Sequence, residues 1–363
     1  MKLGLFGYGT IGRGVYTLVE GLEKSYDVTI KKVFDLPIKK EQLKEKLVTN
    51  IEDIIHDDEI QCVIEVLGGH DVPYEVITRS LKKGKSVITA NKEVVSNHLE
   101  EFINLAHENH CYFCFEASAG GGIPVLRPLI DNLKVNEVND IFAILNGTTN
   151  YILTRMDEDN LSFDDALFLA KKNGFAEANP TADLEGLDIV RKINIISSLA
   201  FKGNIKNEDI YHYGITGVNK DILDSIKKEG YALKFVASSS KNEENEAFIR
   251  VEPTMVSLNH PFAAVKNEFN AVLFTGSTNG DLMFYGKGAG SIPTATAIVA
   301  DLVSILENRA YIDYKNQNDL KVNQSKRNPF KYFIFASDGS YVIKEEVSDE
   351  ELLSASFYAR VIS

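Results

Sequence analysis

Apolar and polar residues follow two different patterns within the first 115 positions of the chain. Short apolar runs, typical of buried strands, are separated by stretches whose apolar residues recur every three or four positions, as in amphipathic helices. The strand-like runs are Lys2–Phe6, Val28–Phe34, Cys62–Leu67, Ser86–Thr89 and Cys111–Phe115. The helix-like stretches between them are Ile11–Leu22, Tyr74–Leu81 and Glu93–Ala106. This alternation predicts an α/β fold, a parallel sheet with helices on both faces.

The pattern changes after Asn136, where helices and strands no longer alternate one by one. A strand-like stretch at Asp140–Leu145 comes first. The helix-like stretches that follow it are Asn150–Glu158, Ser162–Asn173 and Gly186–Phe201, and the next strand-like stretches are Tyr231–Ser238, Ala247–Val251 and Ala271–Thr275. A long apolar helix is expected at Pro293–Leu306. This order predicts an α+β domain with a more antiparallel sheet.

The length of the chain also predicts more than one domain. At 363 residues it is too long for one small core. We expect a first domain over residues 1–125, completed by about 288–313, and a second domain over 126–287. The polar, apolar-poor stretch Tyr314–Asn328 is the expected linker, so 314–363 is interpreted as a linker and a short C-terminal tail.

The segment GYGTIGRG connects the first predicted strand to the first predicted helix. In a G-x-G-x-x-G turn, Gly7 permits the tight turn, Gly9 lets the backbone approach a pyrophosphate, and Gly12 lets helix and strand pack closely. The helix start supplies free N–H groups and a positive dipole end to the phosphates. The strand-turn-helix context predicts a Rossmann-type dinucleotide-binding domain. The residues expected to contact the cofactor here are Gly7, Gly9, Thr10, Ile11 and Gly12.

Charged residues near the second strand bear on the choice of cofactor. Asp35 ends that strand, where a carboxylate can bond both ribose hydroxyls of NAD and repel a 2′-phosphate. Arg13, Lys39 and Lys40 are close enough in sequence to favour NADP instead. We therefore expect NAD to be the cofactor, with NADP as the alternative.

A second glycine-rich segment, VLGGHDVP, follows the third core strand. Gly68 is its candidate cofactor contact, because a second loop would pass the cofactor at this point. His70 is interpreted as a polar loop residue, since nothing in the sequence orients it as an acid or base.

Composition narrows the function class. The net charge of -13 argues against a nucleic-acid partner. No apolar run approaches the length of a membrane span, and MKLGLFGYGT shows no signal-peptide pattern, so a cytoplasmic location is expected. Cys111 and Cys114 form a C-x-x-C in a strand-like run, but positions three apart face opposite sides of a sheet. With Cys62, they are interpreted as reduced thiols that act as small apolar residues.

Five ordered segments resemble the homoserine dehydrogenase family over about residues 1–310: TANKEVVS, EASAGGGIP, LNGTTNYIL, GFAEANPTADLEGLDIVRK and GKGAGSIPTA. The resemblance implies reversible NAD(P)H-dependent reduction of L-aspartate 4-semialdehyde to L-homoserine, on the path to threonine and methionine. It also implies a homodimer built through strands of the second domain.

The fourth of these segments gathers carboxylates ahead of a lysine. Asp188 and Lys192, four apart in a helical pattern, share one face and can pair. Reduction of an aldehyde needs a donor at the carbonyl oxygen, and a fixed ammonium such as that of Lys192 serves this role. The resemblance implies that Glu177 and Asp183 bind the substrate's ammonium group and that Lys92 is a second active-site lysine. One departure is Asn179, where the family usually has aspartate, so fine substrate contacts are affected.

The resemblance also assigns residues around the pocket. Ser118 and the NGTT stretch are expected to line it, and Gly288 to return the chain to the cofactor. Substrate contacts are expected at Asn146, Gly147 and Thr148. A monovalent cation, Na⁺ or K⁺, would bind the Glu116 carboxylate with three backbone carbonyls, those of Ala119, Gly121 and Ile123. A glycine loop shaped only to contact the nicotinamide is an equal alternative.

Two other functions fit the sequence less well. A dinucleotide-binding regulator would keep the fold without turnover, but Lys92 and Lys192 are both present. Aspartate-semialdehyde dehydrogenase needs a nucleophilic cysteine beside the cofactor, and no cysteine here has that context.

The tail from Asn328 has strand-like pieces at Lys331–Ala336 and Tyr341–Lys344, an acidic SDEELL stretch and a final strand-like SFYARVI. Many family members end in a ferredoxin-like β-α-β-β-α-β regulatory module, which needs more residues than this. An incomplete or replaced module is therefore expected, and threonine is expected to leave activity unchanged.

Overall fold

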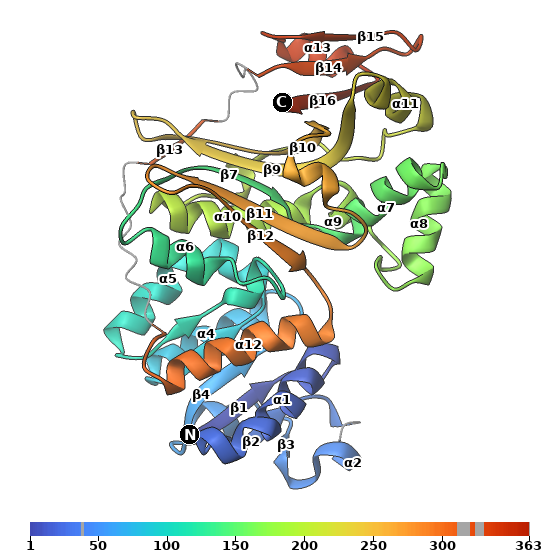
Figure 1. Ribbon diagram of the computed structural model, residues 1–363. Coiled ribbons are helices and arrows are strands. Elements are labelled where there is room, and N and C mark those ends of the chain that lie inside the picture. Colours follow the sequence, from blue (N-terminus) through green and yellow to red (C-terminus); the bar gives the residue numbers. More distant parts are fainter. Residues whose placement is uncertain (38–39, 311–319, 324–329, 363) are drawn as a thin grey trace. The chain divides into compact units, whose positions relative to one another are not determined.

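The computed structural model describes residues 1–37, 40–310, 320–323 and 330–362, which form two compact units. Unit 1 comprises Met1–Lys134, Ser198–Asn204 and Ala289–Asn318. Unit 2 comprises Val135–Ser197, Ile205–Gly288 and Asp319–Ser363. Figure 1 follows the chain through both, and each is described by itself.

Unit 1 is built on a parallel sheet of six strands in the order β3-β2-β1-β4-β5-β6. The strands are β1 (Lys2–Phe6), β2 (Thr29–Phe34), β3 (Leu47–Val48), β4 (Ile60–Glu65), β5 (Ser86–Thr89) and β6 (Phe113–Cys114). The helices are α1 (Thr10–Tyr26), α2 (Lys40–Leu43), α3 (Glu52–Ile55), α4 (Asp71–Lys82), α5 (Lys92–Glu108), α6 (Leu126–Asn132) and α12 (Ser291–Leu306). The predicted Rossmann-type parallel sheet is confirmed.

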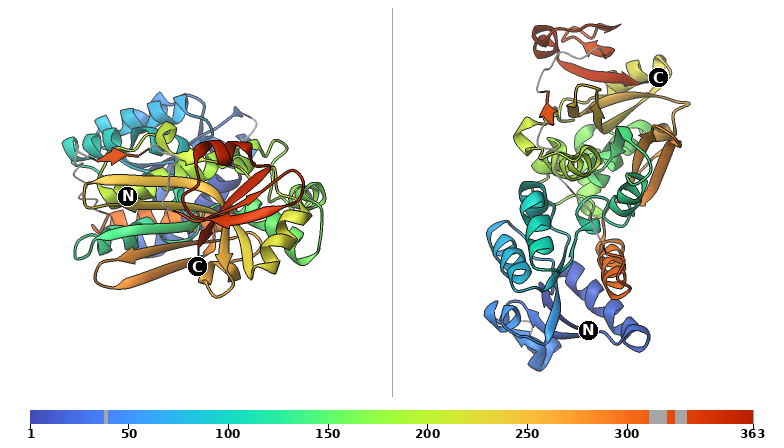
Figure 2. Two further views of the ribbon diagram at one scale, coloured as in Figure 1. Left: turned by 90° about the horizontal axis from the view of Figure 1, so that it is seen from above. Right: turned by 90° about the vertical axis from the view of Figure 1, so that its left-hand side faces the viewer.

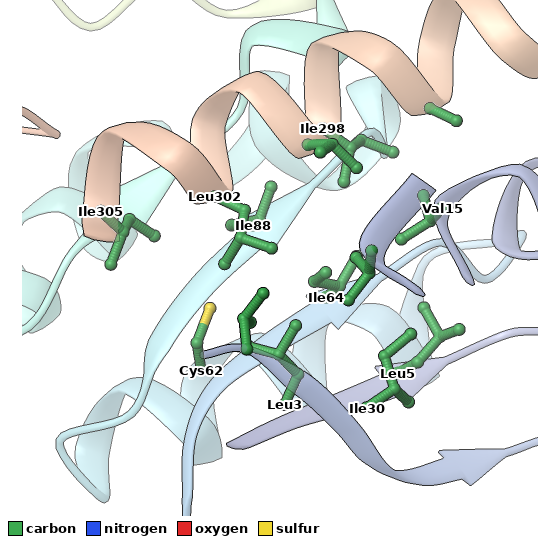
Figure 3. Packing of buried hydrophobic residues seen from close by; sticks show 14 of the residues in the cluster. Leu3, Leu5, Val15, Ile30, Cys62, Ile64, Ile88, Ile298, Leu302 and Ile305 are labelled. Carbon is green, nitrogen blue, oxygen red and sulfur yellow. The ribbon is translucent and has the colours of Figure 1, made fainter. Parts of the chain in front are cut away.

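Helices α1 and α12 pack together on one face of this sheet, and α4 and α5 lie on the other (Figure 2). The first of these layers is filled by small branched side chains, such as Val15 from α1 and Ile298 from α12, packed against Leu5 and Ile64 of the sheet (Figure 3). α12 is therefore part of the core of unit 1 although it follows most of unit 2 in sequence.

Unit 2 contains a mixed sheet of ten strands, with β12-β11-β7-β9-β10-β16-β14-β15 as its main order. The strands are β7 (Val138–Ile144), β8 (Tyr211–His212), β9 (Tyr231–Lys241), β10 (Glu246–Ser257), β11 (Phe269–Gly276), β12 (Gly280–Lys287), β13 (Lys321–Val322), β14 (Tyr332–Phe335), β15 (Tyr341–Lys344) and β16 (Phe357–Ile362). The helices are α7 (Gly147–Glu158), α8 (Phe163–Lys172), α9 (Thr181–Leu184), α10 (Leu187–Phe201), α11 (Lys220–Lys228) and α13 (Asp349–Ser354). The predicted α+β class, with a largely antiparallel sheet, is confirmed.

Several elements of unit 2 were not predicted, among them the strand β12 and the helix α11. β12 is an edge strand whose residues are all exposed or half-buried, and its apolar run, 282–285, is short. α11 is short and buries only Ile222, Leu223 and Ile226. Both lack the long apolar period on which prediction depends.

The described part of the tail joins the sheet of unit 2. β14 and β15 form a hairpin, and β16 pairs with both β14 and β10, with Thr254 opposite Arg360 (Figure 1). The acidic stretch SDEELL, for which no structure was predicted, forms α13. Its start is a capping box in which Ser348 and Glu351 bond each other's backbone N–H. Much of the predicted linker lies outside the described residues.

No helix within the described ranges is long and apolar enough to cross a membrane.

Candidate functional site

The glycine turn of unit 1 leaves an open space at the start of α1. Gly7 has φ +101° and donates its N–H to the Phe34 carbonyl at 2.9 Å. A Cβ on Gly12 would lie 2.0 Å from the Gly7 carbonyl oxygen, so a side chain there would separate helix and strand. A Cβ on Gly9, the N-cap of α1, would meet no atom within 4 Å. The N–H groups at the helix start thus adjoin free volume, as binding of a pyrophosphate requires.

Asp35 is tied to this turn. Its carboxylate accepts the N–H groups of Tyr8 and, at 2.6 Å, Leu36. The guanidinium of Arg13 lies over the Tyr8 ring, 5.8 Å from its centroid. Lys39 lies outside the described residues, and the side chain of Lys40 is not described.

The carboxyl ends of β4 and β5 are held together by Glu65, which sequence reasoning missed. Its fully buried carboxylate accepts the Thr89 hydroxyl at 2.5 Å and the Leu67 N–H at 2.6 Å. Thr89 Oγ1 in turn accepts the N–H of Asn91 at 3.0 Å. Burial raises the pKa of Glu65 to about 7. The sequence signal for this role was an acidic residue, Glu65, at the end of the apolar strand β4.

Two predicted site residues, Gly68 and Lys92, follow the two strands that Glu65 joins. Gly68 is exposed, and a Cβ there would meet no atom within 4 Å. Lys92 is the first residue of α5, three positions after β5, and is half-buried. Asn91 caps this helix by accepting the N–H groups of Glu93 and Val94.

Glu116 caps a helix. Its buried carboxylate accepts the backbone N–H groups of Val125, Leu126 and Arg127 at 2.6, 2.7 and 2.9 Å, at the start of α6. Burial raises the pKa of Glu116. Ser118 is also buried and donates its hydroxyl to the Phe115 carbonyl at 2.6 Å.

The carbonyls of the predicted cation site follow Glu116. No hydrogen bond described for the chain ends on the carbonyl oxygen of Ala119, Gly121 or Ile123. Gly121 has φ +60°, which turns the backbone here. Across the described ranges, no group of three or more metal-ligating side chains occurs. Any cation here would therefore depend on backbone oxygens.

Unit 2 brings four predicted residues into one buried network. Lys192 Nζ donates to Asp188 Oδ2 at 2.8 Å and to the Leu145 carbonyl at 2.8 Å. Asn146 Nδ2 donates to the same Asp188 oxygen at 3.0 Å and to Asp183 Oδ1 at 2.8 Å. The Leu145 carbonyl is a partner that sequence reasoning did not identify.

The backbone holds this network in place. Asn146 is the N-cap of α7, because its Oδ1 accepts the Thr149 N–H at 2.9 Å. Lys192 and Asp188 are both on α10, where the expected i,i+4 pair forms. Burial, and next the Asp188 carboxylate, raise the pKa of Asp183. An added cation close to Asp183 would relieve this cost.

Other predicted residues lie around the network. A Cβ on Gly147 would lie 2.8 Å from the Glu268 carbonyl oxygen, so a side chain does not fit. Thr148 donates its hydroxyl to the Phe175 carbonyl. Glu177 is exposed, and no contact described for unit 2 joins it to the network.

Two further residues have structural roles. Asn179 takes the place of the expected aspartate and accepts the Thr181 hydroxyl at 2.7 Å, which stabilises the turn before α9. A Cβ on Gly288 would lie 1.9 Å from Asn270 Nδ2, so only glycine fits the end of unit 2.

The three cysteines have no apparent chemistry at these sites. Cys62 and Cys114 are buried and Cys111 is half-buried, and all three are free thiols. Burial raises their pKa, for Cys111 to about 11. The thiolate form needed by a nucleophile is therefore disfavoured.

Comparison with known proteins identifies relatives. The family model described as "Homoserine dehydrogenase" matches residues 124–303, and the one described as "Homoserine dehydrogenase, NAD binding domain" matches residues 7–116. A homoserine dehydrogenase of Bacillus subtilis is 39% identical over 318 residues, which cover 85% of this chain and 73% of that protein. One from Synechocystis is 38% identical over 317 residues, 84% of this chain and 73% of the relative.

Solved structures agree with the sequence relatives. The crystal structure of a homoserine dehydrogenase from Thiobacillus denitrificans matches with a TM-score of 0.89 at 27% identity and covers 100% of this chain and 98% of that one. That of S. aureus homoserine dehydrogenase at pH 8.5 matches with a TM-score of 0.83 at 30% identity, covering 100% and 99%.

Proposed function

The chain belongs to the homoserine dehydrogenase family and is an NAD(P)-dependent oxidoreductase, and from this premise we propose which residues interconvert L-aspartate 4-semialdehyde and L-homoserine. Unit 1 holds the cofactor and unit 2 contributes the substrate's acid–base and ammonium-binding groups. The observation that carries this assignment is the buried network of Lys192, Asp188, Asn146 and Asp183.

Lys192 is the proton donor in the reducing direction. An ammonium has three N–H donors. Two of them are used in the described contacts, by Asp188 and by the Leu145 carbonyl, and the third is left for the substrate oxygen. Because Lys192 is buried, its charge acts in a medium where it stabilises a developing oxyanion strongly. In the oxidising direction the same nitrogen takes the proton of the hydroxyl.

Asp188 holds the ammonium of Lys192 in position, and Asp183 binds the substrate's own ammonium group. The positive charge of that group would offset the repulsion between the Asp183 and Asp188 carboxylates. Glu177 is assigned a second, exposed contact to the ammonium, and Asn146, Gly147 and Thr148 line the substrate side. Lys92 acts as the second lysine of the active site.

The cofactor-binding residues are Gly7, Gly9, Thr10, Ile11, Gly12, Asp35, Gly68, Lys92, Ser118 and Gly288. The open volume at Gly9 and the helix N-terminus beside it fit a pyrophosphate. When bound, the nicotinamide gives or receives the hydride.

We place NAD ahead of NADP, because the Asp35 carboxylate retains lone pairs for the ribose hydroxyls after accepting two N–H groups. Arg13, whose guanidinium lies over the Tyr8 ring, is the described cation that would favour a 2′-phosphate. Asp35→Ser should therefore lower the ratio of kcat/KM for NAD⁺ to kcat/KM for NADP⁺. A wild type that already prefers NADP⁺ strongly would overturn this preference.

A monovalent cation, Na⁺ or K⁺, fits the carbonyls of Ala119, Gly121 and Ile123 with Glu116. The three carbonyls lack hydrogen-bond donors among the described residues, and Glu116 Oε2 accepts only one of the described N–H bonds. Hard cations prefer such oxygen ligands. Turnover that rises with NaCl or KCl, but not with tetramethylammonium chloride, tests this site.

We further propose a cytoplasmic homodimer joined through the sheet of unit 2. Met283 and Tyr285 are exposed apolar residues of its edge strand β12. Molar mass from light scattering during size-exclusion chromatography tests the dimer.

The experiment that tests the assignment follows reduced-nicotinamide absorbance after addition of L-homoserine with NAD⁺ and, separately, NADP⁺. We expect turnover with at least one cofactor and its loss in Lys192→Ala. Full turnover in that variant would overturn the assignment of the network.

A further inference from the structure

Two histidines that are 28 positions apart face each other in unit 1. His70 precedes α4 and His98 lies within α5, and their Nε2 atoms are 3.1 Å apart. Their side chains are 36% and 26% exposed, so ions in solution can reach the space between them.

Each ring has a carboxylate beside its other nitrogen, fully exposed for Asp71 and partly exposed for Glu101. His70 Nδ1 lies 3.0 Å from Asp71 Oδ1, and His98 Nδ1 lies 3.2 Å from Glu101 Oε2. Tyr74 donates its hydroxyl to the other oxygen of Glu101 at 2.9 Å and so fixes that carboxylate. An ionised carboxylate only accepts hydrogen bonds, so both Nδ1 atoms carry the proton.

When both rings are neutral, this proton assignment leaves a lone pair on each Nε2, on the side where the two rings meet. Two acceptors at 3.1 Å repel unless one of them carries a proton, as in an N–H···N hydrogen bond, or both bind one metal ion. Metal-binding histidines typically have this arrangement, with a carboxylate on the distal nitrogen that fixes the tautomer and raises the basicity of the ligand.

The distance also suits a metal. Two nitrogens bound at about 2.0–2.1 Å, with an angle between octahedral and tetrahedral values, are separated by about 2.8–3.4 Å. The observed 3.1 Å falls within this range.

The backbone and two neighbouring rings position His98. α5 departs from helical geometry at His98, with φ −132° and ψ 20°. α5 contains no proline or glycine, so neither of these residues causes the kink. The rings of Tyr74 and Phe102 pack against His98 at 4.4 and 5.7 Å between centroids and hold its imidazole in place.

We propose that His70 and His98 form a binding site for a divalent transition-metal ion of the zinc and nickel class. Asp71 and Glu101 orient the two ligands, and water fills the remaining positions, since the described residues offer no third ligating side chain. The ion would join the loop after β4 to α5, the segments that carry Gly68 and Lys92. The site is separate from the proposed chemistry of the reaction.

The test is calorimetric titration of the full, untagged, metal-free chain with NiCl₂ and, separately, ZnCl₂ in a non-coordinating buffer. We expect one ion per chain, with affinity lowered at least about tenfold in His70→Gln and in His98→Gln, and about 10–100-fold in Glu101→Gln. His56→Gln is the matched control. His56 also lies near a carboxylate, 3.3 Å from Glu52, but has no second histidine described beside it, so its loss should leave the affinity unchanged.

A second measurement needs no variant. Cu²⁺ added at one equivalent to the wild-type chain should give an electron paramagnetic resonance spectrum with splitting from two nitrogens. Absence of binding below millimolar metal, or equal affinity in wild type and both histidine variants, would overturn the proposal.

Discussion

The proposed ligand sites of the two units are built from different groups. In unit 1 the site around Gly9 is made of backbone and empty volume, and side chains are kept out at Gly7 and Gly12. In unit 2 the site is made of buried charged side chains, with Lys192 and Asp188 in contact at 2.8 Å. Substitutions that add a side chain should therefore impair ligand binding by unit 1, and substitutions that remove a charged side chain should impair the function of unit 2.

Buried carboxylates show the same contrast. Asp188 in unit 2 is neutralised by an ammonium, whereas Glu65 in unit 1 accepts only a hydroxyl and a backbone N–H. Burial dominates in the second case and raises the pKa of Glu65 to about 7. A carboxylate in an ion pair stays charged and can take part in a reaction, whereas a buried carboxylate that only accepts hydrogen bonds from neighbouring segments has a structural role.

The largest effect is expected from removal of the ammonium in unit 2. Lys192→Ala should lower kcat by about 10²–10⁴-fold, because the transition state loses its proton donor. The Kd of the cofactor should change little, since unit 1 is untouched. Stopped-flow turnover and fluorescence titration of NADH measure the two quantities.

Controls separate this effect from a general loss of charge. Lys228→Ala removes an exposed lysine of α11 and should leave kcat unchanged. Asp188→Asn should lower kcat while retaining the Asn146 contact. If Lys192→Ala raised only KM, the lysine would be a binding residue.

In unit 1 the matching change adds one methyl group. Gly12→Ala places a Cβ 2.0 Å from the Gly7 carbonyl oxygen, so the turn must shift, and we expect a loss of about 1–3 kcal/mol in unfolding free energy with weaker cofactor binding. Gly9→Ala meets no protein atom, so it should weaken cofactor binding without loss of stability. Thermal melts and cofactor titrations give both readouts.

Gly21→Ala is the control for this pair. It lies on the same helix, its Cβ would meet no atom within 4 Å, and alanine is the better helix former. Stability equal to or above wild type is expected. A stable Gly12→Ala with normal cofactor affinity would contradict the proposed contrast between the units.

Sequence reasoning succeeded where a single local pattern determines the outcome. β1 and β5 were predicted to the residue, and the Asp188–Lys192 pair follows from helical spacing alone. The Asn146 bridge between Asp183 and Asp188 joins segments about 40 positions apart, which periodicity cannot detect. For the same reason the histidine pair and the Glu65–Thr89 bond were missed.

The anchoring role of Glu65 predicts a pH effect of smaller size. A folded-state pKa of about 7, above the ordinary value near 4.3, means that the native state binds the extra proton between these values. Stability from this group is complete below about pH 4.3 and is lost as the pH rises through about 7. Glu65→Gln mimics the protonated form, so its melting temperature should fall less between pH 5 and 8 than that of wild type.

Asp301 shares this sign and window, because burial raises its pKa to about 7 as well. The fall in melting temperature between pH 5 and 8 should therefore be smaller in Glu65→Gln than in wild type, but it should not disappear. An identical slope in both proteins would mean that Glu65 is already ionised when folded.

The smallest expected effect concerns the tail and threonine. A split β-α-β pattern places a helix between its first two strands. Here β14 and β15 are instead joined by a tight turn, in which Ala336 N–H donates to the Ser340 carbonyl at 2.8 Å and Gly339 has φ +84°. β16 then pairs with β10, so the tail extends the sheet of unit 2. We therefore expect several millimolar L-threonine to leave the initial rate of homoserine oxidation unchanged, as an equal concentration of L-serine should. Saturable inhibition by threonine alone would show that these strands form an effector site, and that unit 2 also binds a ligand outside its charged network.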